Sequence, residues 1–127
     1  MALSVSTNER VELVDISDRV AGELPSDATG ICTVFCTHTS AGLLIQENES
    51  RLKRDLLGLL ERVVPEAGGY EHDEIDDNAD AHLRATLLDS SLSIPVKNGA
   101  LQLGTWQTIF LVECDEPRTR KIIVTVT

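Results

Sequence analysis

The sequence predicts a single α+β domain, residues 1–127, in which mostly antiparallel β-sheets pack with two main helices. Apolar residues recur at helical spacing in only two long segments, whereas the last third consists of short β-rich runs separated by turns. The strands do not alternate regularly with helices, which argues against a doubly wound parallel sheet. At 127 residues the chain has the length of one domain and can bury a core without disulfides.

The first half of the chain contains one clear helix among β-rich runs. Apolar residues recur at helical spacing in 49–64, and Asn48 is the expected N-cap. A strand of period two over 30–38 places Cys36 and His38 on one face. The elements expected here are a strand or bent pair over 3–15, a helix over 17–24, a strand over 30–38, an extended piece over 41–46 and the helix over 49–64.

The second half begins with a polar, acidic loop over 66–77. A helix follows to Leu88, with Asp77 or Asn78 as the expected cap. The pair Asn98-Gly99 is a strong hairpin signal, and a turn over 115–118 separates the last two strands. The strands expected in this half are 91–96, 100–103, 108–113 and 121–127.

The charge of the chain excludes several classes of partner. The formal net charge is −10, from 21 acidic and 11 basic residues. Such a surface repels nucleic-acid backbones and anionic membranes, so neither is an expected partner. Acid-rich, lysine-poor surfaces also suit concentrated salt, where screening removes their self-repulsion. A halophilic source is therefore one hypothesis, with an ordinary acidic cytosolic protein as the alternative.

The cysteines and the N-terminal segment indicate a cytoplasmic protein. Cys32, Cys36 and Cys114 form an odd set without CxxC spacing, which favours a reducing compartment. The first residues lack a basic stretch followed by an apolar run, so no signal peptide is expected. The apolar runs are too short to span a bilayer.

Three histidines are the main candidates for chemistry. His38 ends a predicted strand, His72 lies in the acidic loop, and His82 lies one turn into the following helix. Imidazole is a common zinc ligand, and neighbouring acids can ligate or orient the rings. The expected cofactor is therefore a divalent metal, zinc first, with manganese, nickel or magnesium as alternatives. The spacing matches neither HExxH nor a paired-cysteine finger, and each histidine alone also fits an ordinary surface or core position.

Each of the other polar candidates also has an ordinary structural interpretation. Cys36 could be a nucleophile, but a small buried residue is the favoured interpretation. Arg118 and Arg120 could hold a phosphate or carboxylate, with solvated arginines as the alternative. Gln107, next to Trp106, could point into a polar cavity. No phosphate-binding glycine loop is present, which argues against the common nucleotide-dependent enzymes.

Four blocks in order along the chain carry a resemblance to a known family. They are 37–41 (Thr-His-Thr-Ser-Ala), 72–82, 91–109 with its Gly-Thr-Trp-Gln, and 117–120 (Pro-Arg-Thr-Arg). With them the chain resembles the YjbQ family, whose members are also described as secondary thiamine-phosphate synthases. One position departs from the family: Gln46 stands where Asn is common, followed by the matching Glu47 and Asn48.

The resemblance implies a compact α+β domain that assembles as a homotrimer, with candidate sites near subunit contacts. It also implies a metal held by the motif histidines, which here fall on His38, His72 and His82. The implied activity joins hydroxymethylpyrimidine pyrophosphate to thiazole phosphate, so a small phosphorylated molecule is the expected ligand. Loss of pyrophosphate requires cationic groups, of which this acidic chain has few.

Matching residues to this reaction gives each candidate a role. The candidate catalytic residues are Glu47, Asp77 and Gln107. The candidate substrate-binding residues are Asn48, Asn78, Arg118 and Arg120. Two other classes of function stay open: a non-catalytic trimeric protein that binds a metal or small anion, and a hydrolase that uses metal-activated water.

Overall fold

Eight strands form two antiparallel sheets in the computed structural model, which describes residues 1–127. The larger sheet has the order β1-β8-β3-β5-β6 and the smaller one β2-β7-β4. The strands are β1 (Ala2–Ser6), β2 (Glu12–Asp15), β3 (Gly30–Cys36), β4 (Ala41–Gln46), β5 (Ser91–Lys97), β6 (Ala100–Leu101), β7 (Thr108–Glu113) and β8 (Thr119–Val126). The helices are α1 (Ser17–Gly22), α2 (Ser50–Val63), the 3-10 turn η1 (Glu71–Glu74) and α3 (Ala79–Thr86). The predicted α+β class is confirmed.

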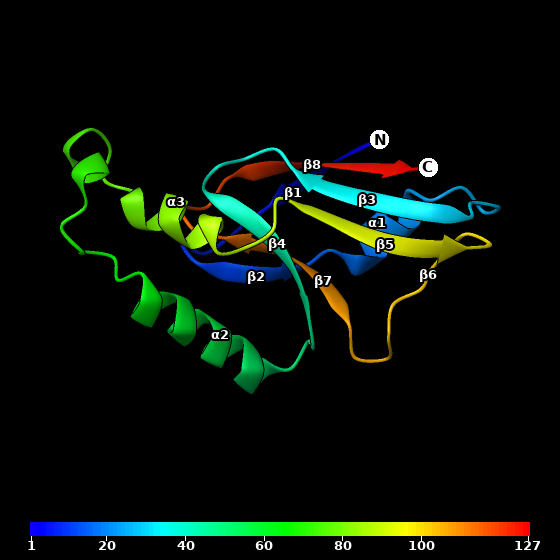
Figure 1. Ribbon diagram of the computed structural model, residues 1–127, viewed down its shortest axis with the longest axis horizontal. Coiled ribbons are helices and arrows are strands. Elements are labelled where there is room, and N and C mark those ends of the chain that lie inside the picture. The colour runs from blue at the N-terminus through cyan, green and yellow to red at the C-terminus, as the bar shows by residue number, and fades with distance from the viewer.

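The smaller sheet is the middle layer of the molecule (Figure 1). Its central strand β7 is buried on both faces because its side chains alternate between two cores. Ile109 and Leu111 belong to the main core with the larger sheet, while Phe110 and Val112 belong to a second cluster with α2 and α3. A strand covered on both sides needs a continuous apolar run, which 109–112 supplies.

A buried ion pair lies where the chain passes between the two sheets. Arg120 on β8 pairs with Glu113 on β7, and both side chains are 1% exposed or less. The Arg120 Nε–H donates to Glu113 Oε1 at 2.8 Å. Thr7, between β1 and β2, donates its hydroxyl to the same carboxylate at 2.8 Å. Ser40, between β3 and β4, accepts from Arg120 Nη2 at 3.1 Å. The pair therefore joins three crossings between the sheets.

The charges of this pair are satisfied by partners rather than by water. Burial alone would raise the pKa of Glu113, but hydrogen bonds from Arg120, the Asp115 amide and Thr7 outweigh burial and lower it. No buried side-chain nitrogen or oxygen lacks a hydrogen-bond partner. A complete set of partners is what makes a buried charge tolerable.

Several predicted element boundaries require correction. Of the two alternatives for 3–15, the pair of strands is the one observed, and its members lie in different sheets because the chain crosses between layers near Thr7. The predicted cap at Asn48 is wrong: Glu49 accepts a hydrogen bond from the Leu52 amide at 2.8 Å. The strand predicted over 121–127 begins two residues earlier, at Thr119, and so contains Arg120.

Smaller differences affect the ends of other elements. The strand predicted over 30–38 ends at Cys36, so His38 lies beyond the sheet. The second long helix ends at Thr86 rather than Leu88, and the strand predicted over 100–103 is confined to Ala100–Leu101. The acidic loop contains one 3-10 turn.

The hairpin at Asn98-Gly99 is confirmed. Both residues have positive φ, 50° and 79°, as a tight hairpin turn of mirror-image type requires. A Cβ added at Gly99 would lie 2.6 Å from the Ser26 carbonyl oxygen, so space as well as backbone conformation requires glycine.

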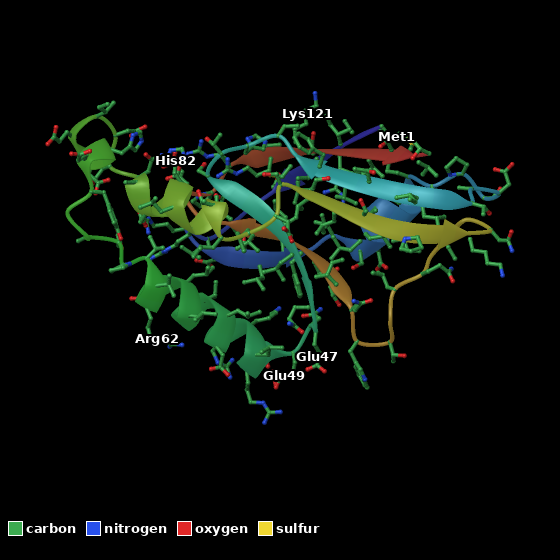
Figure 2. The ribbon with its side chains drawn as sticks, in the orientation of Figure 1. Met1, Glu47, Glu49, Arg62, His82 and Lys121 are labelled. Carbon is green, nitrogen blue, oxygen red and sulfur yellow. The ribbon has the colours of Figure 1, made fainter.

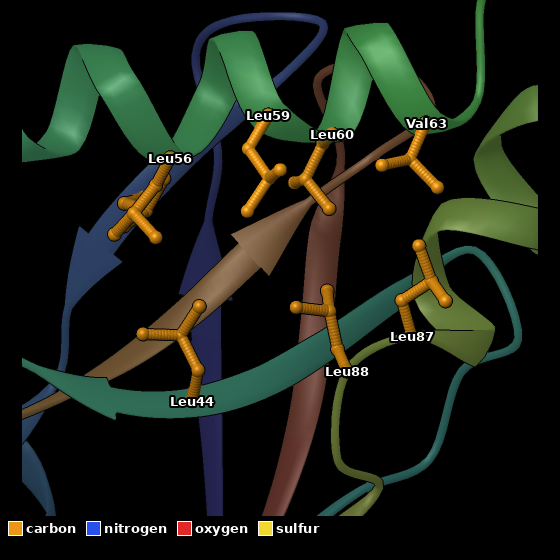
Figure 3. Close-up of a pocket in the computed structure, with 8 residues that line it drawn as sticks. Leu44, Leu56, Leu59, Leu60, Val63, Leu87 and Leu88 are labelled. Atoms are coloured by element: carbon orange, nitrogen blue, oxygen red, sulfur yellow. The ribbon is translucent and has the colours of Figure 1, made fainter.

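Helix α2 lies over the smaller sheet without filling the space beneath it. A cavity of about 280 Å³ remains between them, lined by aliphatic side chains that point toward one another from α2 on one side and from the sheet and the C-terminal end of α3 on the other (Figure 3). Only Leu60 of this helix is buried, and Val63 is 57% exposed. None of the helices is both long and apolar enough to traverse a lipid bilayer.

We expect Arg120→Met to lower the free energy of unfolding by about 3–5 kcal/mol, because Glu113 would stay buried without a partner. The matched control Arg51→Gln removes an arginine that is 81% exposed in its ion pair with Glu49, and should change the free energy of unfolding far less, because solvent screens exposed pairs. Urea denaturation gives both values. The double variant Glu113→Leu/Arg120→Met should recover part of the loss, and equal effects for Arg120→Met and Arg51→Gln would contradict the assigned role.

Candidate functional site

Two of the three histidines lie together where the 3-10 turn meets α3. The ring centroids of His72 and His82 are 5.0 Å apart, with the planes at 89°. His72 is exposed on the turn, and His82 is half-buried on the helix. Both rings line a pocket of about 380 Å³ together with Tyr70, Glu71 and Leu83. Of the residues expected to meet around this loop, His72 and His82 lie together within one chain, whereas Asp77 and His38 line other pockets.

A chain of hydrogen bonds fixes the orientation of His72. Arg118 donates to the Asp115 carboxylate at 2.9 Å, and the Asn78 amide NH₂ donates to the same oxygen at 3.2 Å. The carboxylate only accepts, so the Asn78 oxygen must point the other way, toward His72 Nε2 at 3.2 Å. His72 therefore carries its proton on Nε2, which leaves the Nδ1 lone pair free.

A backbone carbonyl fixes His82 in the same manner. His82 Nδ1 lies 3.1 Å from the Thr39 carbonyl oxygen, which can only accept, so Nδ1 carries the proton. The lone pair of Nε2 is then free. Thr39 precedes Ser40, whose hydroxyl and carbonyl oxygens accept from the buried Arg120 guanidinium. The ion pair between the sheets thereby anchors the loop that orients His82.

His38 belongs to a different environment. Its Nε2 accepts a hydrogen bond from the Lys121 amide at 2.7 Å, so this lone pair is in use. Burial and the nearby positive charge of Arg120 lower the pKa of His38 below its ordinary 6.5. The ring lines a separate pocket of about 210 Å³ beside Thr86 and Ser90. His38 is therefore held neutral, with Nδ1–H as its remaining polar group.

The donor set of a single chain does not fit a three-ligand metal site. His72 and His82 each present one free ring nitrogen, but no group of three or more histidine, cysteine or acidic side chains is placed to hold a metal ion. Zinc sites in proteins use three or four protein ligands. The two imidazoles alone fall short of such a set, and His38 does not join them within the chain.

The acids expected around the histidines have other partners. Asp80 is 1% exposed and pairs with Arg10 at 3.1 Å, so its carboxylate is occupied, and it does not line the pocket of His72 and His82. Asp73 accepts from the Ala79 amide at 3.0 Å and begins α3 in place of a capping side chain from Asn78. Asp77, a predicted catalytic residue, is exposed and lines a separate hollow with Asp73 and Glu66.

The remaining predicted residues form a second cluster elsewhere on the molecule. Glu47 and Asn48 follow β4 and line a pocket of about 370 Å³ with Trp106. Gln107 is next to this pocket, and its side-chain oxygen accepts from the Gly104 amide at 2.8 Å. Figure 2 shows Glu47 and His82 on different sides of the molecule, so one chain does not bring the two clusters together.

The two predicted phosphate-binding arginines differ in their availability. Arg120 is buried and fully engaged with Glu113 and Ser40, so the structure gives it an architectural role instead of a ligand contact. The Arg118 side chain is 39% exposed and pairs with Asp115 and Glu116. Arg118 can therefore reach a ligand, whereas Arg120 could do so only if its buried pair with Glu113 were broken.

Cys36 is buried, as the favoured interpretation predicted, and all three cysteines are unpaired. Burial raises the pKa of the Cys36 thiol above its ordinary value of 9.0, more than the nearby His38 amide and Arg120 lower it. A buried neutral thiol is a poor nucleophile, so the structure supports a packing role for Cys36.

Sequence reasoning missed two groups that orient the histidines. Asp115 connects Arg118 to Asn78, yet the sequence indicates only that it lies in a turn. The Thr39 carbonyl fixes His82, and a backbone acceptor carries no sequence signal. The hydroxyl-rich run 37–40 was the available hint to this loop.

The comparisons with known proteins agree with this architecture. The family model described as UPF0047 protein YjbQ-like matches residues 1–127. A UPF0047 protein of Methanothermobacter thermautotrophicus is 49% identical over 126 residues, which are 98% of this chain and 88% of the relative. A UPF0047 protein of Archaeoglobus fulgidus is 48% identical over 124 residues, 98% of both chains. The chain belongs to the YjbQ family.

Solved structures show the same fold. A protein of Aeropyrum pernix K1 superposes with a TM-score of 0.95 at 33% identity, covering 100% of this chain and 96% of that one. A YjbQ/UPF0047 family protein of Clostridium acetobutylicum gives a TM-score of 0.90 at 38% identity, covering 100% of this chain and 99% of that one. The arrangement of two sheets and flanking helices is thus a property of the family.

The lowered pKa of His38 predicts a stability change in acid. Protonation favours the unfolded state, in which the pKa is higher, so the contribution is complete above about pH 6.5 and is lost as pH falls toward the folded-state pKa. We expect His38→Gln, which keeps an acceptor for the Lys121 amide, to lose less stability than wild type between about pH 7.5 and 5.5. Thermal unfolding measures this, with His72→Gln as control. Parallel curves for wild type and His38→Gln would refute the assignment.

Proposed function

We propose that the protein is a cytoplasmic metal-dependent enzyme that acts on a small phosphorylated molecule at the pocket of His72 and His82. The observation that carries this proposal is the pair of oriented imidazoles, each with one free ring nitrogen at the same pocket. Fixed tautomers maintained by hydrogen bonds on the opposite ring nitrogen are typical of metal-binding histidines. Zinc is the favoured metal because it accepts nitrogen ligands in several geometries, with manganese, nickel and magnesium as alternatives.

The chain's own residues supply binding and orientation at this pocket. Asn78 holds His72, the Thr39 carbonyl holds His82, and Arg118 lies at the start of the network that reaches His72 through Asp115. Arg118 can bind phosphate oxygens if it exchanges its contact with the exposed Glu116 carboxylate. A divalent metal bound at the imidazoles would add positive charge to neutralise a phosphate or pyrophosphate group.

The finer proposal is a reaction of thiamine-phosphate synthase type. It joins hydroxymethylpyrimidine pyrophosphate to thiazole phosphate with loss of pyrophosphate. The support for this assignment is the resemblance of the four motif blocks, together with membership of the YjbQ family over residues 1–127. Glu47, Asp77 and Gln107 stay predicted catalytic residues, and Asn48 stays a predicted substrate contact.

A homotrimer with sites near its subunit contacts is part of the same proposal. The histidine pair offers two ligands, fewer than a zinc site requires, and Glu47 lies on another side of the chain. A neighbouring copy could supply the missing groups; His38, the predicted third ligand, would first have to release the Lys121 amide from its Nε2. The three unpaired cysteines favour the cytoplasmic location.

The test is metal analysis of the purified protein with two variants. We expect zinc titration calorimetry to show saturable binding for wild type and loss of binding for His72→Ala and His82→Ala, because each removes a free ring nitrogen. Cys32→Ala, which truncates a buried side chain away from the pocket, is the control for folding and should bind like wild type.

The same proteins decide between an enzyme and a binding protein. We expect the wild-type gene to restore growth of a thiamine auxotroph lacking its synthase, and the His82→Ala gene to fail. Zinc binding without complementation would leave the non-catalytic metal-binding protein or a metal-dependent hydrolase. If zinc binds wild type and both alanine variants equally, the metal site is not at these histidines.

A further inference from the structure

The second pocket, distant from the histidines, contains the only tryptophan of the chain. Trp106 is 71% exposed, although its indole would gain considerably from burial. A short turn holds it outward: the Gln107 amide donates to the Gly104 carbonyl at 3.0 Å, and the Gly104 amide donates to the Gln107 side chain at 2.8 Å. The ring is therefore presented to solvent by an ordered loop with bonds at both ends.

The hollow beside this ring is rich in oxygen acceptors and has no basic side chain in its lining, although Arg51 pairs with the lining residue Glu49 at 2.6 Å. It has a volume of about 370 Å³, and its lining residues are Glu47, Asn48, Glu49, Thr105, Trp106 and Thr108. Glu47 is half-buried, and its carboxylate makes no hydrogen bond or ion pair within the chain. Asn48 donates to Asp15 at 3.3 Å, which leaves its amide oxygen free to accept.

The chemistry of the lining selects the charge of a ligand. An anion would meet the free Glu47 carboxylate, and the nearby Arg51 is already paired with Glu49. The N-terminus of α2 cannot compensate, because the Glu49 carboxylate already accepts from the Leu52 amide there. A cation gains from the carboxylate, from the face of an indole and from the net charge of −10.

The same lining distinguishes an organic cation from a metal ion. Calcium takes about six to eight oxygen ligands, and magnesium is usually held by carboxylates together with substrate phosphates and waters. One free carboxylate with scattered neutral oxygens is a dedicated site for neither ion. An aromatic face contributes nothing to such a coordination sphere, but it is the main attraction for alkylated ammonium groups. The exposed indole beside a single unpaired carboxylate therefore favours an ammonium ligand.

We propose that the pocket between Trp106 and Glu47 binds a small organic cation bearing an alkylated ammonium group, which lies on the indole face with its charge toward the carboxylate. This site needs no metal at His72 and His82, but it shares Glu47 and Asn48 with the proposed function, which names them as a predicted catalytic residue and a predicted substrate contact. Its ligand is opposite in charge to the phosphorylated molecule proposed there.

The single tryptophan makes the site directly measurable. We expect choline, titrated at constant ionic strength, to change the Trp106 fluorescence saturably with a dissociation constant below about 10 mM. The neutral isostere 3,3-dimethylbutan-1-ol has the same shape without the charge, and should give no saturable change.

Two variants test the named contacts. Glu47→Gln should weaken choline binding by about tenfold, because it removes the charge and keeps the shape. Glu61→Gln removes the same charge from the exposed side of α2 and should bind like wild type. Trp106→Leu, followed by calorimetry, should abolish binding without a change in melting temperature.

Three results would overturn the proposal. They are choline and its neutral isostere titrating alike, a fluorescence change that does not saturate, and equal losses in Glu47→Gln and Glu61→Gln. None of these readouts depends on zinc or on complementation, so failure here is separate from failure of the proposed function.

Discussion

Glu113 and Arg120 face each other at the corner where the chain passes between its two sheets, and both are withdrawn from water. Either charge alone would be costly to bury. Together, with Thr7 and Ser40 as further partners, they connect three of the crossings between the sheets. The relative position of the two sheets therefore depends on a hydrogen-bonded pair with a defined geometry, in addition to apolar burial that is tolerant of small shifts.

The position of the candidate site follows from this corner. Ser40 is held by Arg120, the adjacent Thr39 carbonyl orients His82, and the Lys121 amide that follows Arg120 binds His38. Helix α3 then places His82 against His72. The buried pair of Arg120 and Glu113 thus helps to determine which ring nitrogens are free. The orientation of the rings at the exposed pocket depends on these buried groups.

The parts of this structure that are encoded locally could be predicted from the sequence. The hairpin at Asn98-Gly99 and the pairing of His72 with His82 depend on residues close in the chain. The role of Arg120 could not be predicted, because its partners come from β7 and from the crossing before β4. His38 was expected on a strand face with Cys36, but the strand ends first and the Lys121 amide binds the ring.

The most direct test of how the buried groups orient these rings is long-range proton–nitrogen NMR on the three histidines near neutral pH. It identifies which ring nitrogen carries the proton in each neutral imidazole. The hydrogen bonds predict a proton on Nε2 of His72 and on Nδ1 of both His82 and His38. A proton on Nε2 of His82 or His38, or rapid exchange between tautomers at either residue, would contradict the claim that the buried corner orients these rings.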